Sequence, residues 1–312
     1  MTSLEILKLL TTDVFSWMLL GVVLTWVGIF TQKRIQFFLK KVVINFLFPC
    51  LILEKILLNL VLVDIPNIAL LFGGALIMFL GSCFISSFWV PHTVKDPPTV
   101  NSMMLCNTFH NYGFMVFPIC LSLLGEKGLA LTLIYSFTGD ALLWSLGIYL
   151  VQRKPGIRVS GKGIITPPAI AVCLSVFLAL AEAPKFIPSQ IFSILHYPAL
   201  LTIPMALIAS GGIFFISLSS INKKDLPIKE ISLSLISRMI FLPILWLFCI
   251  SLFLPESMAK SILSIEAIMP ASVVIVALVT IYGGNQKFAV LFSLITNMIA
   301  IITIPLYLKF IL

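Results

Sequence analysis

The stretch Asn107-Thr-Phe-His-Asn-Tyr-Gly-Phe-Met-Val-Phe-Pro118 decides how this chain is interpreted. It lies inside an apolar segment, from roughly 103 to 124, that is long enough to be a membrane helix. Backbone polar groups freed by its Gly and Pro are tolerated at membrane depth only where protein or a cavity surrounds them. A helix interrupted near the bilayer midplane is typical of secondary transporters. The alternative is a Pro-kinked packing helix, because Gly and Pro are common in membrane helices.

The composition is that of a polytopic α-helical membrane protein. Hydrophobic residues make up 60% of the 312 residues and charged residues 10%, and the mean hydropathy is +1.14. These values exclude an ordinary soluble domain. The net charge of +8 comes from short basic clusters between apolar spans, so it does not indicate nucleic acid as a partner. The six cysteines form no Cys-x-x-Cys pair and favour neither a disulfide framework nor a zinc site, and no cofactor is expected.

We predict ten membrane spans of about 20 residues each. They cover residues 13–31, 37–58, 67–89, 101–124, 128–151, 165–182, 195–218, 232–254, 257–281 and 287–310. A basic loop, 152–164, separates two halves of five spans, 1–151 and 165–312. Because five is odd, the second half is inverted relative to the first, which is the architecture of inverted-repeat transporters.

The distribution of Lys and Arg predicts that both termini lie outside. In that orientation thirteen basic residues fall in inside loops and six on the outside, with Arg238 left within a span. Basic residues concentrate on the cytoplasmic side of membrane proteins. We therefore expect a multi-pass protein of the cell (inner) membrane with loop 152–164 in the cytoplasm. Glu54 and Lys55, near the outer end of span 2, are expected to reach the membrane interface.

A second interrupted segment occurs at the matching place of the second half. Span 9 reads Ile265-Glu-Ala-Ile-Met-Pro-Ala-Ser-Val273, and its Pro270 follows Asn111 by 159 positions. Pro49 and Pro204, in spans 2 and 7, are 155 positions apart. Paired interrupted spans are the best indication that a sequence gives of a binding site at the midplane.

Four ionisable residues fall within spans: His110, Asp140, Arg238 and Glu266. A charge at the bilayer centre costs about 2.5–3.5 kcal/mol on insertion scales, so it usually faces a cavity or a partner. Desolvation favours the neutral form of a carboxyl group, which makes Asp140 and Glu266 candidate proton carriers. The alternative is that Arg238 neutralises one of them in a buried pair. His110 is either a packing residue or a ligand-binding residue.

The interrupted segments and several flanking motifs match one known family in order and spacing. Residues 111–118 resemble that family's Asn-Thr-Gly-x-x-Gly-x-Pro crossover in the fourth span, with the same spacing from Asn to Pro. Further similar segments, spread over essentially the whole chain, are Ile44-Asn45-Phe-Leu-Phe-Pro49, Leu124-Gly125, Leu143-Trp144, Ile203-Pro204, Ser210-Gly211, Met269-Pro270-Ala-Ser272, Ile281-Tyr282-Gly283 and Ile301-Ile-Thr-Ile-Pro305-Leu. The chain thus resembles the auxin efflux carrier family, the PIN-like group that includes bacterial organic-acid permeases.

The resemblance implies a fold like that of the bile-acid and sodium–proton exchangers, an all-α membrane protein of ten helices. Spans 1, 2, 6 and 7 would form a scaffold, and spans 3–5 with 8–10 a moving transport domain. Spans 4 and 9 would cross at their breaks, marked by Gly113, Pro118, Met269 and Pro270, with the substrate beside the crossover. Homodimers through the scaffold are implied as well.

Six residues are expected to contact the substrate. They are Asn107, His110, Asn111, Tyr135, Asp140 and Ser272. By the resemblance, Asn111 maps on the crossover Asn, and Asp140 falls where plant auxin carriers place a Gln that faces the substrate. Asp140 and Glu266 are the candidates for proton or ion coupling, and no metal site is expected.

Several positions depart from the family pattern. Val116 stands where the family has Gly, and Tyr112 where it has a small Thr, so a narrower pocket is expected. His110 and Asp140 change the charge of the pocket, which favours a small organic anion other than auxin as substrate. Loop 152–164 is too short for the plant carriers' long central loop.

Three alternatives remain beside a proton-coupled carrier. A sodium-coupled carrier of bile-acid type would use span-9 carbonyls and Glu266 as ligands. A sensor of the same fold would bind the ligand without moving it. A membrane-embedded enzyme is disfavoured, because Gly139-Asp140 lacks the first Gly of the Gly-x-Gly-Asp motif of intramembrane aspartyl proteases and no His-Glu-x-x-His motif occurs.

Overall fold

The computed structural model describes residues 8, 10–61, 64–152, 166–219 and 226–311. These residues form helices joined by short connections, with one isolated β-bridge. The predicted all-α class is therefore confirmed for this part of the chain. The predicted cytoplasmic loop lies, apart from Gln152, outside the described residues.

Six helical stretches are long and apolar enough to span a membrane. They are Gln32–Asn59, Ile65–Thr93, Val116–Gln152, Ser189–Ser219, Ile228–Phe253 and Gln286–Ile311. Two shorter apolar helices are Ser16–Trp26 and Pro167–Leu180. A multi-pass membrane protein follows from these helices. The ten-span inverted repeat stays a prediction, because six helical stretches of the described residues, not ten, are long and apolar enough to span a membrane.

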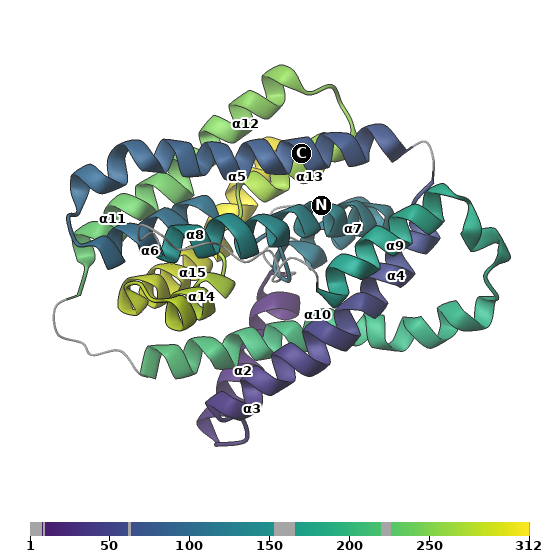
Figure 1. The fold of residues 1–312 in the computed structure, drawn as a ribbon, viewed down its shortest axis with the longest axis horizontal. Helices are drawn as coiled ribbons and strands as arrows, with labels where there is room; N and C mark the ends of the chain where they lie inside the picture. The colour runs from purple at the N-terminus through teal and green to yellow at the C-terminus, as the bar shows by residue number, and fades with distance from the viewer. Residues whose placement is uncertain (1–7, 9, 62–63, 153–165, 220–225, 312) are drawn as a thin grey trace. The chain divides into compact units, whose positions relative to one another are not determined.

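Contacts within the chain group its residues into two compact units. Unit 1 comprises Met1–Phe72, Gly113–Phe137 and Ile165–Ile216, and unit 2 comprises Gly73–Tyr112, Thr138–Ile164 and Ser217–Leu312. Two long helices, α5 (Ile65–Thr93) and α7 (Val116–Leu142), contribute residues to both units (Figure 1). A sharp bend divides α7 at Gly125, whose φ of 70° lies outside the helical region.

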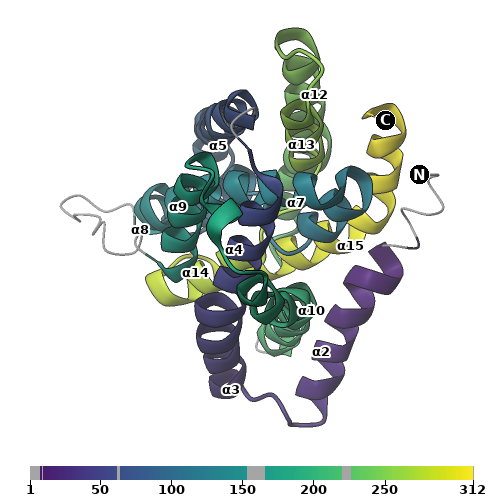
Figure 2. The same ribbon diagram turned by 90° about the vertical axis from the view of Figure 1, so that its right-hand side faces the viewer.

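Unit 1 is built around α4, which packs against α9 (Figures 1 and 2). Its elements are η1 (Leu10–Phe15), α2 (Ser16–Trp26), α3 (Gln32–Phe37), η2 (Phe38–Leu47), α4 (Phe48–Asn59), α9 (Pro167–Leu180), η6 (Ala183–Phe186) and most of α10 (Ser189–Ser219). The backbones of α2 and α10 approach closely at two glycines. A Cβ on Gly21 would lie 1.9 Å from the carbonyl oxygen of Ile208, and one on Gly211 1.9 Å from that of Met18. Small residues allow such close packing between membrane helices.

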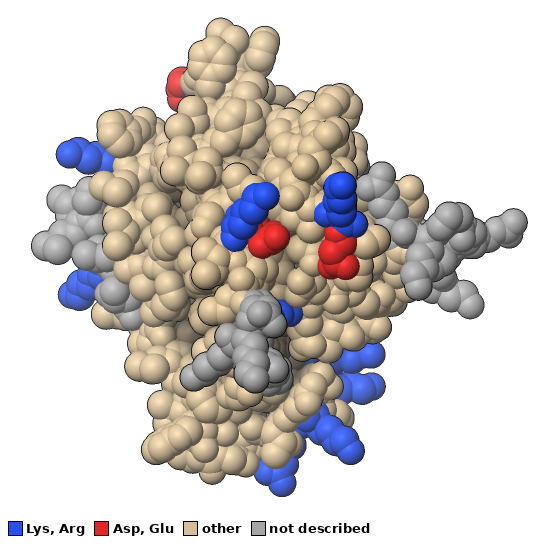
Figure 3. Space-filling model, turned by 90° about the vertical axis from the view of Figure 1, so that its left-hand side faces the viewer, with Lys and Arg blue, Asp and Glu red and all other residues tan. Residues whose placement is uncertain are grey.

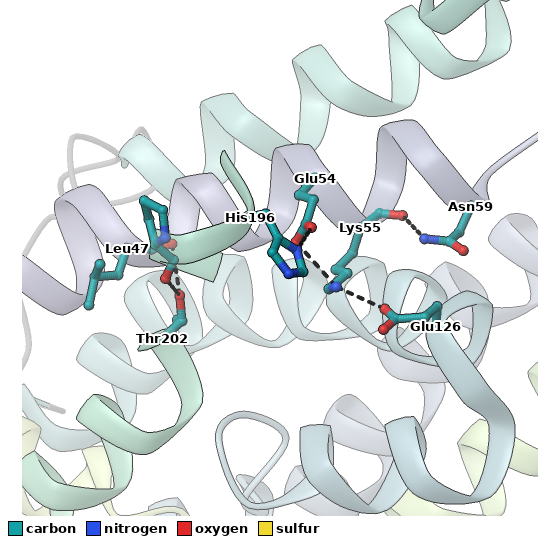
Figure 4. Close-up of polar contacts among 8 residues, drawn as sticks. Leu47, Glu54, Lys55, Asn59, Glu126, His196 and Thr202 are labelled. Carbon is teal, nitrogen blue, oxygen red and sulfur yellow. Dashed lines mark hydrogen bonds and ion pairs between the residues drawn. The ribbon is translucent and has the colours of Figure 1, made fainter. Parts of the chain in front are cut away.

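A network of charges links α4 to α7 and α10 within unit 1 (Figure 4). Lys55 Nζ lies 3.2 Å from Glu54 and 3.0 Å from Glu126, and His196 Nδ1 lies 2.7 Å from Glu54 Oε1. Glu54 is 2% exposed and Lys55 7%. The expectation that these two side chains reach the membrane interface is wrong, because they are buried against protein and paired there.

A second ion pair holds the same turn of α7. Lys127 Nζ lies 2.7 Å from Asp64 Oδ1, and Asp64 Oδ2 accepts a hydrogen bond from the backbone N–H of Val61. Glu126 and Lys127 directly follow the bend at Gly125 and carry opposite charges. Together they fix this bend to α4 and to the segment that follows α4.

Unit 2 gathers its remaining helices around α15, which packs against α6, α11 and α14. Its elements are α6 (Pro97–Thr108), η4 (Leu143–Gly147), α8 (Ile148–Gln152), α11 (Ile228–Ile236), η7 (Ser237–Phe241), α12 (Leu242–Phe253), α13 (Met258–Ala267), α14 (Val274–Tyr282) and α15 (Gln286–Ile311). α12 runs beside α13 (Figures 1 and 2). The indole N–H of Trp246 in α12 donates to Ser82 Oγ in α5 at 3.0 Å.

Candidate functional site at two interrupted segments

The first interruption follows α6. Asp96 caps this helix by accepting a hydrogen bond from the backbone N–H of Thr99 at 3.1 Å. The helix ends at Thr108, and the next residue is extended, with φ −102° and ψ 107°. Because the helix resumes only at Val116, residues 109–115 are a non-helical segment inside a predicted span.

The second interruption follows α13. Ser257 caps α13 by accepting from the backbone N–H of Lys260 at 3.1 Å. Between α13 and α14, residues 268–273 are non-helical. Pro270 lies within this segment, and a proline has no N–H with which to continue the hydrogen bonding of a helix.

The two interrupted segments lie side by side within unit 2 and pair through their backbones. His110 and Ala271 form an antiparallel β-bridge. The N–H of Asn111 donates to the carbonyl of Pro270 at 2.7 Å, and the N–H of Ser272 donates to the carbonyl of Phe109 at 3.1 Å. Each break therefore supplies partners for backbone groups that the other break leaves without a helix.

Side chains of α15 satisfy further backbone groups of the second break. Thr296 Oγ1 accepts from the N–H of Ala271 at 3.3 Å, and Asn297 Nδ2 donates to its carbonyl at 3.0 Å. Ser293 Oγ donates to the carbonyl of Ser272 at 3.3 Å. All three α15 side chains are buried, at 0–1% exposure. Asn297 Oδ1 also accepts from Asn111 Nδ2 at 3.2 Å, which connects both breaks to α15.

Two ionisable side chains meet at the paired breaks. His110 Nε2 lies 3.3 Å from Glu266 Oε2, and the two side chains are 2% and 0% exposed. The imidazole stacks on Phe79 of α5, with ring centroids 4.7 Å apart and planes 6° apart. Neither carboxylate oxygen of Glu266 has a hydrogen-bond partner in the described part of the chain. A buried acid without hydrogen bonds is costly, so this position calls for a functional reason.

Arg238 is the third buried charge at this place, and it comes from η7. Its Nε and Nη2 donate to the carbonyl oxygen of Met269 at 3.2 and 2.8 Å, and the residue is 1% exposed. Its positive charge acts electrostatically on both His110 and Glu266. The guanidinium thus binds the backbone of the second break and places a fixed positive charge near Glu266.

Asp140 is held by the residue that follows Asn111. The hydroxyl of Tyr112 donates to Asp140 Oδ1 at 3.0 Å, and Asp140 is partly buried. The Tyr112 ring lies over Gly139, where an added Cβ would come within 2.8 Å of it. Gly139 therefore gives the ring the space it needs to reach the neighbouring carboxyl group.

Asn107 is the next-to-last residue of α6 and contacts α11. Its Nδ2 donates to the carbonyl of Met103 at 2.9 Å and to Ser234 Oγ at 3.2 Å. Within the described residues, Asn107 Oδ1 and Thr108 Oγ1 are buried and have no hydrogen-bond partner. Two acceptor oxygens thus stand without donors at the helix end that precedes the first break.

Three of the predicted site residues belong to unit 1. Gly113 accepts from the backbone N–H of Val116 at 3.0 Å, so its carbonyl begins α7. Pro118 lies in the first turn of α7, after the break and where a proline is tolerated. Tyr135 is fully buried on α7. The other predicted residues, including Met269 and Ser272, lie at or beside the paired breaks in unit 2.

Comparison with known proteins finds similarity to membrane transporters. The family model for membrane transport proteins matches residues 10–160. An uncharacterized transporter of Methanocaldococcus jannaschii is 28% identical over 218 residues, which are 67% of each chain. The resemblance to the auxin efflux carrier family is confirmed.

The residues matched by the membrane transport family include one half of the candidate site. Residues 10–160 contain the first break and Asp140, whereas Arg238, Glu266 and the second break lie beyond them. Together with the apolar helices, this match indicates an integral multi-pass membrane protein that is similar to membrane transport proteins. In the part of the chain that the structure describes, no group of three or more His, Cys, Asp or Glu side chains is arranged to hold a metal ion.

Proposed function

We propose that this protein is a secondary transporter that moves a small organic anion, such as a carboxylate, by alternating access. The observation that carries the proposal is the pairing of the two breaks, with the N–H of Asn111 on the carbonyl of Pro270. Interrupted membrane helices expose backbone dipoles for binding a solute, which continuous helices cannot do. In the same unit, Arg238 adds positive charge near the breaks.

In this proposal Asn111 orients the substrate. Its side chain is partly exposed, and its amide nitrogen donates to Asn297 Oδ1, an acceptor that a substrate carboxylate can replace. Asn107, His110, Tyr135 and Ser272 complete the expected set of contacts. An anion binds near a carboxyl group only where that group is protonated or paired, so Asp140 holds a proton when the substrate is bound.

The proposed moving part is the transport domain of spans 3–5 and 8–10, and the scaffold consists of spans 1, 2, 6 and 7. The grouping of contacts supports this division in part, because unit 1 holds the scaffold segments and unit 2 most of the others. Residues 113–137 are the exception, since they belong to unit 1. A homodimer through the scaffold and outside termini complete the proposal.

Flux through proteoliposomes tests this function. Uptake and efflux of labelled malate, malonate and indole-acetate are measured with an imposed pH gradient and no sodium. We expect transport of at least one acid to follow the proton gradient, to fall at least tenfold in Asn111→Ala and to lose its pH dependence in Asp140→Asn. Asn101→Ala is the matched control. Asn101 lies near the start of α6, away from the break, and its side chain donates to the carbonyl of Val151 in α8. Tight binding without flux would favour a sensor and overturn the proposal.

A sodium-coupled carrier is the second candidate. It is favoured by the buried oxygens of Glu266, Asn107 and Thr108 that lack hydrogen-bond donors, because sodium binds oxygen ligands of this kind. The same vesicles decide between the two candidates. Flux that requires a sodium gradient, and that is lost in Glu266→Gln while Asp140→Asn retains it, would replace the proton by sodium as the coupling ion.

A further inference from the structure

One end of the helix formed by α3, η2 and α4 carries more positive charge than its surroundings neutralise. Lys33, Arg34, Lys40 and Lys41 are all exposed. Within the described residues none of the four is in an ion pair. Figure 3 shows basic side chains gathered low on one face of the molecule without acidic neighbours, whereas basic side chains near the middle of that face lie beside acidic ones. We call these four residues the α3 basic face.

The length of this helix places the α3 basic face at the level of lipid headgroups. The helix has 28 residues, from Gln32 to Asn59. At about 1.5 Å per residue it is about 40 Å long, whereas the hydrocarbon core of a bilayer is about 30 Å thick. The stretch that follows Lys41 is apolar from Val42 to Leu53 except for Asn45. The segment from Gln32 to Lys41 therefore extends beyond the hydrocarbon into the headgroup layer.

The basic side chains share one side of this segment. Lys33, Phe37 and Lys41 follow each other at intervals of four residues, about one helical turn each, and Arg34 and Lys40 flank that row. Phe37 is 63% exposed. An exposed aromatic side chain among cations is typical of a segment at the membrane interface.

The opposite side of the segment packs against α10, another helix of unit 1. Ile35 is 1% exposed, and its Cδ1 lies 2.2 Å from where a Cβ on Gly212 of α10 would stand. Thr31 Oγ1 caps α3 by accepting from the N–H of Arg34 at 3.4 Å, and Arg34 Nη1 donates to the carbonyl of Ile29 at 3.2 Å. The helix end is therefore held in one orientation, with its lysines directed outward.

We infer that the α3 basic face binds the headgroups of anionic phospholipids and so anchors unit 1 at a defined depth in the bilayer. Clusters of Lys and Arg beside a membrane span attract anionic lipid because the negative surface potential and the positive side chains are complementary. The attraction depends on the net negative charge of the headgroup, which phosphatidylglycerol carries and zwitterionic phosphatidylcholine does not. This inference does not depend on the proposed transport function.

The test uses the full chain in nanodiscs that contain equal amounts of phosphatidylglycerol and phosphatidylcholine. Native mass spectrometry gives the ratio of the two lipids that remain bound after release. The test variant is Lys33→Gln/Lys40→Gln/Lys41→Gln, which removes three exposed charges and leaves the Arg34 contacts intact. The control, Lys185→Gln/Lys260→Gln/Lys309→Gln, removes the same number of charges elsewhere.

We expect the preference for phosphatidylglycerol to fall at least fivefold in the test variant and less than twofold in the control. The Lys33→Arg/Lys40→Arg/Lys41→Arg variant keeps the charges and should keep the preference. An equal loss in both Gln variants would overturn the inference, because net charge would then account for the binding. So would an unchanged ratio in the test variant, or displacement of the lipid by soluble glycerol phosphate, which would indicate a site for free phosphate.

A measurement on the unmodified protein keeps the inference testable if the triple variant does not fold. Raising the salt concentration from about 0.05 M to about 0.5 M shortens the range of electrostatic attraction severalfold. The bound phosphatidylglycerol should therefore decrease severalfold while the bound phosphatidylcholine stays constant. A ratio that does not change with salt would contradict the inference.

Discussion

The charges that link α4 to α7 and α10 in unit 1 form a chain of partners that ends at the protein surface, whereas those at the breaks of unit 2 do not. Glu54 and Lys55, in the middle of this network, are buried (Figure 4). Glu126 and His196, at its two ends, have side chains that are about half exposed. At the breaks, His110, Arg238 and Glu266 are all at most 2% exposed.

The partners differ as well as the burial. Glu54, Lys55 and Glu126 each lie within 3.2 Å of a side chain of opposite charge, and His196 Nδ1 lies 2.7 Å from Glu54 Oε1. At the breaks, the guanidinium of Arg238 donates to a backbone carbonyl, and both oxygens of Glu266 lack hydrogen bonds in the described part of the chain. The comparison teaches that the first group is suited to holding helices together, whereas the second contains the unsatisfied groups to which the proposed function assigns a proton, an ion or a substrate.

The largest expected effect comes from removing the one permanent cation at the breaks. Arg238→Met leaves the carboxyl group of Glu266 without a nearby fixed positive charge and the Met269 carbonyl without its donors. Removing one of two buried groups that interact electrostatically costs about 3–5 kcal/mol when the other is left charged. We expect the free energy of unfolding, measured by SDS titration in detergent micelles, to decrease by this amount.

The double variant Arg238→Met/Glu266→Gln is the decisive control for that prediction. It removes the uncompensated carboxylate, so it should be more stable than Arg238→Met alone. If the second substitution recovers no stability, the two side chains are not coupled, and Arg238 serves the backbone of the break only.

A smaller effect is expected from the corresponding substitution in unit 1. Lys55→Met leaves Glu54 with His196 as its remaining partner, and it leaves Glu126 exposed to water, so the cost should be about 2 kcal/mol. Lys260→Met is the control, because Lys260 pairs with an exposed Glu256 and such pairs contribute about 0–1 kcal/mol. A loss in Lys55→Met no larger than in the control would mean that the buried network contributes nothing to stability.

The sequence predicts where the membrane helices break, but not how the breaks are held together. Pro270, and the polar residues between Asn107 and Pro118, indicate both interruptions, because a missing N–H or a freed carbonyl is a local property of the chain. The role of Asn297 depends on α15 lying beside residues more than 20 positions away. In the sequence, this role is indicated only by the helical spacing of Ser293, Thr296 and Asn297, which places three polar side chains on one side of an apolar span.

The same limit applies to the charges. Position in an apolar span is enough to identify His110, Arg238 and Glu266 as unusual. The pairing of Lys55 with Glu126 requires that α7 bend at Gly125 beside α4, which only tertiary packing determines. The expected interfacial position of Glu54 and Lys55 is wrong for this reason. The ten-span topology and the substrate contacts stay predictions, because both concern the membrane or a ligand.

The smallest expected effect on stability concerns Asp140, which is more exposed than Glu266. Tyr112→Phe removes the hydroxyl that donates to Asp140 at 3.0 Å. A hydrogen bond to a neutral partner contributes about 1 kcal/mol, and one to an ionised partner about 1.5–3 kcal/mol. The loss of stability in Tyr112→Phe should therefore be about 1 kcal/mol while Asp140 is protonated, and it should increase as rising pH ionises that carboxyl group.

Tyr307→Phe is the matched control, because its hydroxyl donates to a backbone carbonyl at 2.8 Å and that acceptor does not titrate. If the two variants lose the same amount of stability at every pH, Asp140 does not change its protonation in the folded protein, and its proposed role in coupling would be excluded.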